Sequence, residues 1–128
     1  MPPLTRPLQI LIVEDEPIIA FDLHDMLDHA GHDVIGCAAT VAEALGVLSA
    51  RHPDIILTDL NLGAGGSGAD VVRNAMRRNI PCVVVSGNYA AKAGGCPEEI
   101  EGLPIAAMVA KPFTPDQIAN ALTTATAA

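Results

Sequence analysis

The sequence predicts an α/β domain in which helices cover both faces of a five-stranded parallel sheet. Five apolar runs of strand length alternate with segments of helical periodicity, as in repeated β-α units. The chain is 50% hydrophobic but only 2% aromatic, so its core must consist mainly of Val, Ile, Leu and Ala. Parallel strands that are buried on both faces have this composition.

A length of 128 residues is typical of one domain. We expect residues 1–128 to fold as a single domain, with residues 1–6 as a disordered N-terminal arm and residues 126–128 as a frayed tail. Any output must then come from the surface of this one domain.

The expected strands are the apolar runs, and each is followed by a segment that has the length of a helix. The alternation implies right-handed crossovers between parallel strands. The strands are Leu8–Val13, Asp33–Cys37, Asp54–Thr58, Ile80–Val85 and Ile105–Val109.

The first expected helix runs from about Pro17 to Ala30, and Gly31 can end it. Its periodicity places four large apolar residues near one side. They are Ile18, Phe21, Leu23 and Leu27.

Three further helices are predicted from capping motifs at their first turns. Thr40-Val-Ala-Glu43 is a capping box, and Ser67-Gly-Ala-Asp70 is a looser form of it. Thr114-Pro-Asp-Gln117 repeats the box with Pro at the first helical position, so the last helix spans about Pro115–Ala125. The fourth crossover, residues 88–104, is rich in Gly and Pro, and we expect a short helix near Tyr89–Ala93 and then an irregular loop.

Charge and cysteine content argue against several functions. The net charge is −8 and there is no run of Lys or Arg, which argues against direct nucleic-acid binding. Cys37, Cys82 and Cys96 are odd in number and lack CxxC spacing, so neither a disulfide framework nor a metal site is indicated. No apolar stretch reaches the roughly 20 residues that span a bilayer, and we expect a cytoplasmic protein with reduced thiols.

Polar residues follow four of the five strands, and the carboxyl ends of parallel strands share one edge of the sheet, where such sheets bind ligands. The residues are Glu14, Asp15 and Glu16 after the first strand, Asp59 after the third, Ser86 after the fourth and Lys111 after the fifth. Taken singly, each is explained as a helix-dipole, turn or surface residue. Their coincidence at one edge indicates a functional site.

Carboxylates that converge at this edge repel one another unless a cation compensates them. A hard ion with oxygen ligands, such as Mg²⁺, fits such a site. The carboxylate of Asp59 can attack a phosphoryl donor and hold the group as an acyl phosphate. Mg²⁺, Lys111 and Ser86 can then each serve one phosphoryl oxygen.

Four stretches resemble the signatures of response-regulator receiver domains, and together they cover nearly the whole chain in order and spacing. They are LIVEDE at 11–16, ILTDLNLG at 56–63, VVVSG at 83–87 and AKPF at 110–113. The resemblance implies a doubly wound, flavodoxin-like fold with strand order 2-1-3-4-5. It also implies a two-component signalling protein that is not an enzyme beyond catalysing its own phosphorylation and slow autodephosphorylation.

By this resemblance Asp59 is the phosphoacceptor, Ser86 and Lys111 assist it, and the Lys111-Pro112 bond is cis. The implied cofactor is Mg²⁺, with Mn²⁺ as a substitute. Its implied ligands are Asp15, Asp59, the backbone carbonyl of Asn61 and, through water, Glu14.

The implied phosphodonor is a histidine kinase or a histidine phosphotransfer protein, and the implied output is a changed surface for a downstream protein target. Direct contact with nucleic acid or membrane is not expected. We expect a monomer or a weak homodimer.

Two departures from the family pattern concern the output. Met108 occupies the switch position, three residues before the lysine, where the family often has Tyr or Phe, and the fourth helix region is rich in Gly and Pro. Pro81 and the Ser86-Gly87 pair, together with the missing aromatic residue, resemble a subgroup of receivers that lack output domains.

Two other functions are considered. Met108 suggests a receiver-like module that binds its partner without phosphorylation. A Mg²⁺-dependent phosphatase that forms an aspartyl-phosphate resembles a DxDx[TV] pattern after the first strand, and EDEP at 14–17 does not match it.

The remaining candidates are assigned structural roles. Gly63–Gly68 lacks the Lys of a phosphate-binding loop, and a flexible loop before the third helix explains it. Cys82 is predicted to be a small core residue. Surface or helix-end positions are predicted for His24, His29, His32 and His52.

Overall fold

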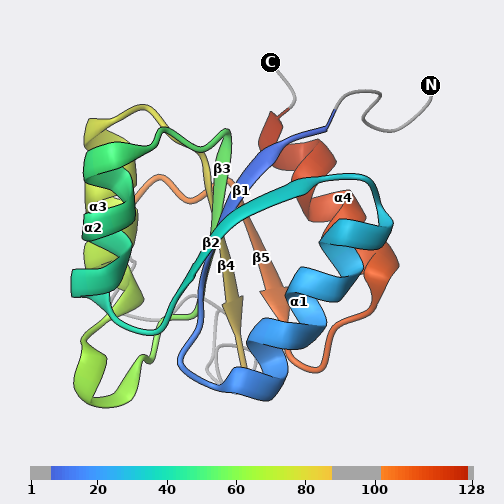
Figure 1. Cartoon of the computed structure of the whole chain (residues 1–128), viewed down its shortest axis with the longest axis horizontal. Helices are drawn as coiled ribbons and strands as arrows, with labels where there is room; N and C mark the ends of the chain where they lie inside the picture. Colours follow the sequence, from blue (N-terminus) through green and yellow to red (C-terminus); the bar gives the residue numbers. More distant parts are fainter. Residues whose placement is uncertain (1–6, 88–101, 127–128) are drawn as a thin grey trace.

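The computed structural model describes residues 7–87 and 102–126, and it places a parallel sheet between two layers of helices (Figure 1). The strands are β1 (Gln9–Val13), β2 (Asp33–Ala38), β3 (Ile55–Thr58), β4 (Cys82–Ser86) and β5 (Ala107–Ala110). The helices are α1 (Pro17–His29), α2 (Val41–Ala50), α3 (Gly68–Arg77) and α4 (Pro115–Thr126), and a short 3-10 helix, η1, spans Gly63–Gly65.

The strand order is β2-β1-β3-β4-β5 and every neighbouring pair is parallel, which confirms the predicted fold class. From β1 the chain passes to one side of the sheet for β2 and to the other side for β3, so the carboxyl ends of β1 and β3 flank a topological switch point. Val13 of β1 is paired with Thr58 of β3. The next residues, Glu14 and Asp59, therefore start side by side at the sheet edge.

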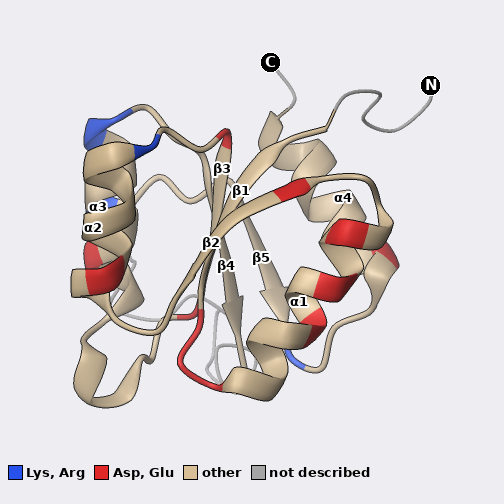
Figure 2. Ribbon diagram, viewed as in Figure 1, with Lys and Arg blue, Asp and Glu red and all other residues tan. Residues whose placement is uncertain are grey.

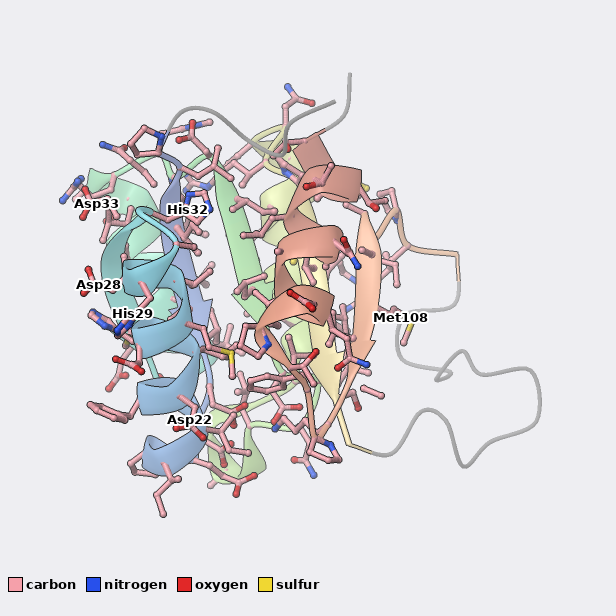
Figure 3. All side chains as sticks on the ribbon, turned by 90° about the vertical axis from the view of Figure 1, so that its right-hand side faces the viewer. Asp22, Asp28, His29, His32, Asp33 and Met108 are labelled. Carbon is pink, nitrogen blue, oxygen red and sulfur yellow. The ribbon has the colours of Figure 1, made fainter. Side chains whose placement is uncertain are left out.

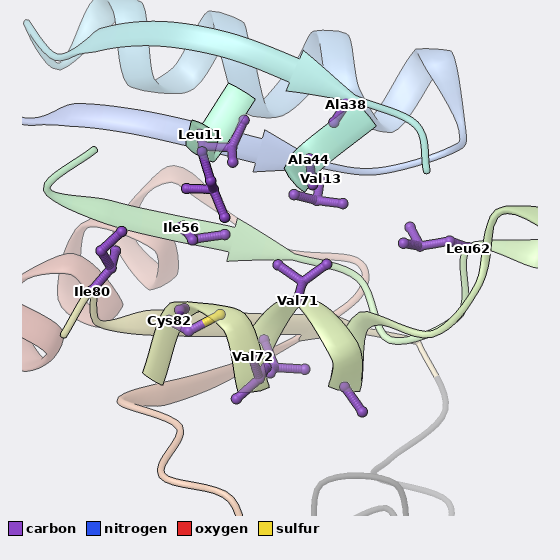
Figure 4. Packing of buried hydrophobic residues seen from close by; sticks show 14 of the residues in the cluster. Leu11, Val13, Ala38, Ala44, Ile56, Leu62, Val71, Val72, Ile80 and Cys82 are labelled. Carbon is purple, nitrogen blue, oxygen red and sulfur yellow. The ribbon is translucent and has the colours of Figure 1, made fainter. Parts of the chain in front are cut away.

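Alternation along the strands gives the domain two core layers, because successive side chains of a strand point to opposite faces. The first layer packs against α2 and α3, and its strand residues include Leu11, Val13, Ile56, Cys82 and Val84 (Figure 4). The second layer packs against α1 and α4, and its strand residues include Ile10, Ile12, Leu57, Val83 and Val85. This confirms the prediction of strands buried on both faces, and with it the core position of Cys82.

The predicted capping box at Thr114 is complete, and the one at Thr40 forms with Glu43 reaching back one residue further, to Ala39. Thr40 Oγ1 accepts a hydrogen bond from the Glu43 N–H at 3.0 Å, and Glu43 Oε1 accepts one from the Ala39 N–H at 2.7 Å. Thr114 Oγ1 accepts from the Gln117 N–H at 3.2 Å, and Gln117 Oε1 accepts from the Thr114 N–H at 2.9 Å. The starts of α2 and α4 are thus fixed by local side-chain chemistry.

The predicted buried face of α1 is wrong in part. Leu23 and Leu27 are buried, but Ile18 and Phe21 are 78% and 69% exposed. The residues of α1 that contact the core are Ile19, Leu23, Met26 and Leu27. At 3.6 residues per turn this stripe has the spacing i, i+4, i+7 and i+8, and Ile18 and Phe21 lie outside it.

Several expectations fall outside the described residues. They are the N-terminal arm at 1–6, the short helix near Tyr89–Ala93, Cys96 and residues 127–128 of the tail. Helix α4 itself includes Thr126. Within the described ranges, every helix is too short or too polar to cross a membrane.

Candidate functional site

The structure brings the predicted site residues together at the carboxyl edge of the sheet. Asp59 follows β3 directly, Ser86 is the last residue of β4, and Lys111 follows β5. They border an open cavity of about 430 Å³ whose lining residues are Asp15, Glu16, Asp59, Asn61, Gly63, Ser86, Gly87 and Lys111. These side chains therefore meet at the carboxyl edge of the sheet.

Lys111 lies between two buried carboxylates. Its Nζ is 2.9 Å from Asp59 Oδ2 and 2.9 Å from Glu14 Oε1, while its side chain is 14% exposed. Burial alone would lower the pKa of Lys111, but its hydrogen bonds to Glu14 and Asp59 outweigh burial and raise that pKa above the ordinary value. Lys111 is therefore a permanent cation within the site.

Glu14 is more deeply buried than the sequence suggested, because its side chain is only 1% exposed. Burial raises the pKa of Glu14 to about 7, although the neighbouring Lys111 ammonium opposes this shift. Glu14 Oε2 accepts a hydrogen bond from the Glu16 N–H at 3.2 Å, and Oε1 faces the Lys111 ammonium at 2.9 Å. Glu14 thus lies behind the cavity as the counter-charge of Lys111, a role that its position in the sequence did not reveal.

The carboxylates also have the chemistry of a cation site. One oxygen each of Glu14, Asp15 and Asp59 lies within 4.8 Å of the other two. Such a set of anionic oxygens, with the Lys111 ammonium shared between Glu14 and Asp59, fits a hard cation of the Mg²⁺ type. Asn61, the other predicted ligand, lines the same cavity.

The segment after Asp59, predicted to be a flexible loop, is a hydrogen-bonded lobe of residues 61–67. Asn61 Oδ1 accepts a hydrogen bond from the Gly63 N–H at 2.9 Å, and an antiparallel bridge joins Asn61 to Ser67. These contacts and the short helix η1 give the segment local structure that its glycine content did not indicate. Ser67 also caps α3 by accepting from the Ala69 N–H at 3.1 Å, so the looser motif forms one half of a capping box.

Gly68 shows why glycine is needed beside Asp59. A Cβ atom at Gly68 would collide with the backbone carbonyl of Asp59, and the Gly68 N–H donates to the Leu60 carbonyl at 2.7 Å. Helix α3 can therefore begin directly against the end of β3. The excess of glycines at 63–68 was the only sequence signal for this close approach.

The end of β5 agrees with the remaining predictions. The Lys111 N–H donates to the Ser86 carbonyl at 3.1 Å, and the Lys111-Pro112 peptide is cis, as predicted. Met108 is half-buried on β5 and packs against the core layer of α2 and α3. Figure 3 shows it beside β5, far from α1.

The histidines lie away from this site, as predicted. His24, His29 and His52 are exposed, and His32 is half-buried at the end of α1 (Figure 3). Charge is also unevenly distributed, because acidic residues gather in the segment after β1 and along α1 (Figure 2). The cavity is thus bordered on the α1 side by a negative surface.

The fold and this set of side chains together define a receiver domain. The sequence matches the response regulator receiver domain family over residues 10–123, and the chain belongs to that family. The phyllosphere-induced regulator PhyR of Methylorubrum extorquens is 36% identical to it over 121 residues, which is 91% of this chain and 43% of that protein.

Solved structures of similar proteins have the same fold. The response regulator PhyR from Brucella abortus superposes with a TM-score of 0.80 at 33% identity, covering 94% of this chain and 48% of that one. SdrG from Sphingomonas melonis Fr1 has a TM-score of 0.77 at 32% identity and covers 97% of this chain and 100% of that one. The chain therefore spans less than half of the PhyR proteins it matches, but all of the SdrG chain.

Proposed function

We propose that Asp59 accepts a phosphoryl group from a histidine kinase or a histidine phosphotransfer protein in a Mg²⁺-dependent reaction. The contact of 2.9 Å between Lys111 Nζ and Asp59 Oδ2, at the border of an open acidic cavity, is the observation that carries this proposal. A carboxylate that lies beside a cation and borders an open cavity can be reached by a donor, which supports its use as the nucleophile.

Each residue of the site has a definite task in the reaction. An oxygen of Asp59 attacks phosphorus while the bond from phosphorus to the donor nitrogen breaks. Lys111 neutralises one phosphoryl oxygen, and the Ser86 hydroxyl is assigned to another. Asp15, Asp59 and the Asn61 carbonyl would hold Mg²⁺, with Glu14 beside them, and the ion would supply charge neutralisation and alignment of the phosphoryl oxygens.

Phosphorylation changes the charge balance around Lys111. The new group carries a charge of about −1.5 to −2 at neutral pH, and Lys111 then faces it as well as Glu14. Because Met108 has no ring to rotate inward, we propose that the signal leaves through displacement of Ser86, Lys111 and the segments attached to them. Its recipient is a downstream protein in the cytoplasm.

The proposal is tested by intact-mass spectrometry after incubation with a small phosphodonor. With Mg²⁺ present, the protein is expected to gain the mass of one phosphoryl group, and with a chelator it is expected to gain none. Asp59→Asn removes the nucleophile and should abolish the gain. Asp70→Asn, which alters an exposed acid on α3, serves as the matched control and should be labelled like the wild type; a label that persists in Asp59→Asn would disprove the assignment.

A second candidate, a module that binds its target without phosphorylation, is favoured only by Met108. The two proposals predict different effects of phosphorylation on the affinity of this protein for a purified target. Tighter binding after phosphorylation supports the switch, and equal affinity before and after supports constitutive binding.

A further inference from the structure

The lobe of residues 61–67 packs against the start of α2. A Cβ atom built on Gly65 would lie 2.8 Å from Thr40 Cγ2 and 3.0 Å from Thr40 Cβ. At the neighbouring glycine, Gly66, a Cβ atom would lie 2.9 Å from Val41 Cγ2. These spacings leave no room for a methyl group, so the backbone of the lobe is in direct contact with the Thr40 and Val41 side chains.

Thr40 is a rigid support for this contact. Its hydroxyl is fixed by the capping box with Glu43, whose carboxylate in turn holds the Ala39 N–H. The preceding residue, Ala38, accepts a hydrogen bond from the Glu14 N–H at 2.8 Å. The support is therefore tied to the end of β1, where the acidic residues of the site begin.

The opposite side of the lobe contacts the acidic residues themselves. The Asn61 N–H donates to Asp59 Oδ1 at 3.3 Å, and Asn61 Oδ1 accepts from the Gly63 N–H. A Cβ atom at Gly63 would lie 3.4 Å from Asp15 Oδ2. The lobe thus lies between Thr40 and the pair Asp15–Asp59. A shift of the lobe away from Thr40 would therefore change its distance from the two carboxylates.

We propose that Thr40 is a positioning residue whose methyl group sets the distance of the lobe from Asp15 and Asp59, and thereby the strength of Mg²⁺ binding. This inference rests on the proposed function, since it concerns the same cation site. Thr40 contacts the lobe rather than the cation, so it acts through Asn61 and Gly63.

The chain offers a steric probe that leaves the backbone conformation undisturbed. Gly63 and Gly66 have φ angles of +59° and +110°, so substitution there would strain the backbone as well as fill space. Gly65 is not among the residues with positive φ, and the three atoms nearest to a Cβ atom at that position all belong to Thr40, its backbone Cα included. Gly46→Ala is the matched control, because nothing lies within 4 Å of a Cβ atom there.

The experiment is a double-mutant cycle of Gly65→Ala with Thr40→Ser, read out as the Mg²⁺ dissociation constant of the unphosphorylated protein by calorimetric titration. Thr40→Ser removes the methyl group and keeps the hydroxyl that caps α2. We expect Gly65→Ala to weaken Mg²⁺ binding roughly tenfold, as for the loss of a residue that orients metal ligands. Thr40→Ser alone should weaken it roughly three- to fourfold, the effect of one lost methyl contact.

The double variant removes the contact with Thr40 Cγ2 but keeps Thr40 Cβ and Cα at 3.0 and 3.1 Å from the new methyl group, so it should recover part of the lost affinity. Gly46→Ala should bind as the wild type does, and urea unfolding checks that every variant is folded. If Gly65→Ala fails to fold, the Mg²⁺ dissociation constant of Thr40→Ser tests the inference by itself.

Wild-type affinity in either Gly65→Ala or Thr40→Ser would overturn the inference, as would a double variant no better than Gly65→Ala. Such results would leave the proposed function intact provided that the wild type binds Mg²⁺ and is phosphorylated. Absence of Mg²⁺ binding in the wild type would overturn both proposals.

Discussion

The ammonium group of Lys111 lies 2.9 Å from a carboxylate oxygen of each of Glu14 and Asp59. Both acids are buried, so the Lys111 ammonium replaces part of the hydration that each carboxylate has lost. Lys111 therefore compensates the carboxylates in the absence of a metal ion, and a bound divalent cation would share that task.

We predict that Lys111→Ala destabilises the metal-free protein by about 2 kcal/mol, since a buried acid that loses its partner keeps its desolvation cost. Saturating Mg²⁺ should restore part of this loss, because the ion supplies the missing positive charge. The measurement is urea unfolding with a chelator and with Mg²⁺.

Arg73→Ala is the control for this prediction, because Arg73 forms an exposed ion pair with Asp70 at 2.8 Å. Its effect should stay below about 0.5 kcal/mol. Equal stability of the two variants in chelator would contradict the compensating role of Lys111.

Residue-level prediction succeeded where position along the chain decided the outcome. Asp59, Ser86 and Lys111 were placed correctly because each follows a strand of a parallel sheet. The pairing of Lys111 with Glu14 was not predictable, since it depends on how two side chains from β1 and β5 orient across the sheet edge.

At the scale of elements, α1 presents two large apolar residues to solvent. Ile18 and Phe21 are 78% and 69% exposed, and the helix begins next to Glu16 at the border of the cavity. The same helix carries much of the acidic surface (Figure 2). A protein donor that reaches Asp59 must pass close to this helix.

We predict that replacing Ile18 and Phe21 with Ala slows phosphotransfer from a protein donor about tenfold or more, because buried apolar anchors dominate protein interfaces. Labelling by a small phosphodonor should not change, and neither should the free energy of unfolding by more than about 0.5 kcal/mol. Met76→Ala, at a 46% exposed position on α3, is the control. Unchanged transfer from the protein donor would rule out docking over α1.

His32 connects the turn after α1 to the start of β1. The His32 ring Nδ1 accepts a hydrogen bond from the Leu8 N–H at 3.0 Å, and the His32 backbone N–H donates to the Leu27 carbonyl at 3.0 Å. Burial lowers the pKa of His32 below the ordinary value of 6.5, so the folded protein favours the neutral ring. As the pH falls through 6.5, the unfolded chain takes up the proton first, and the stability contributed by neutral His32 is lost.

We therefore expect the contribution of His32, measured as the difference in free energy of unfolding between the wild type and His32→Asn, to fall from about pH 7.5 to about pH 5. Exposed His29 has a pKa raised by its hydrogen bond to the Asp25 carbonyl and by the Asp25 carboxylate, which is an effect of opposite sign. The difference in free energy of unfolding between the wild type and His32→Asn at each pH gives the contribution of His32 alone. An identical pH dependence in His32→Asn would contradict this role.

Elements were predictable to the extent that local chemistry defines them. The capping boxes at Thr40 and Thr114 marked the starts of two helices correctly. The buried face of α1 was misjudged because apolar residues occur on several sides of the helix, as at Ile18 and Ile19, so the phase of the stripe is ambiguous. The lobe was missed because Gly65 meets Thr40, a contact between distant parts of the sequence.

At the scale of the whole molecule, topology creates the site. β2 is added on one side of β1, and β3 and the later strands are added on the other side. The carboxyl ends of β1 and β3 therefore lie together, at the edge where Asp15 and Asp59 lie. Strand order and site position followed from the β-α alternation and from the family resemblance. The family resemblance predicted the position of Asp59 but not the route of an output signal, for which Met108 is a departure particular to this chain.

The central claim is that Asp59 itself carries the phosphoryl group, and reductive trapping tests it most directly. An acyl phosphate is electrophilic at its carbonyl carbon, so borohydride converts a phosphorylated aspartate to homoserine while free carboxylates do not react. After incubation with Mg²⁺ and a phosphodonor, peptide mass spectrometry is expected to find homoserine at position 59 alone. Homoserine at Asp15, or no reduced residue in a protein that has gained the phosphoryl mass, would contradict the account.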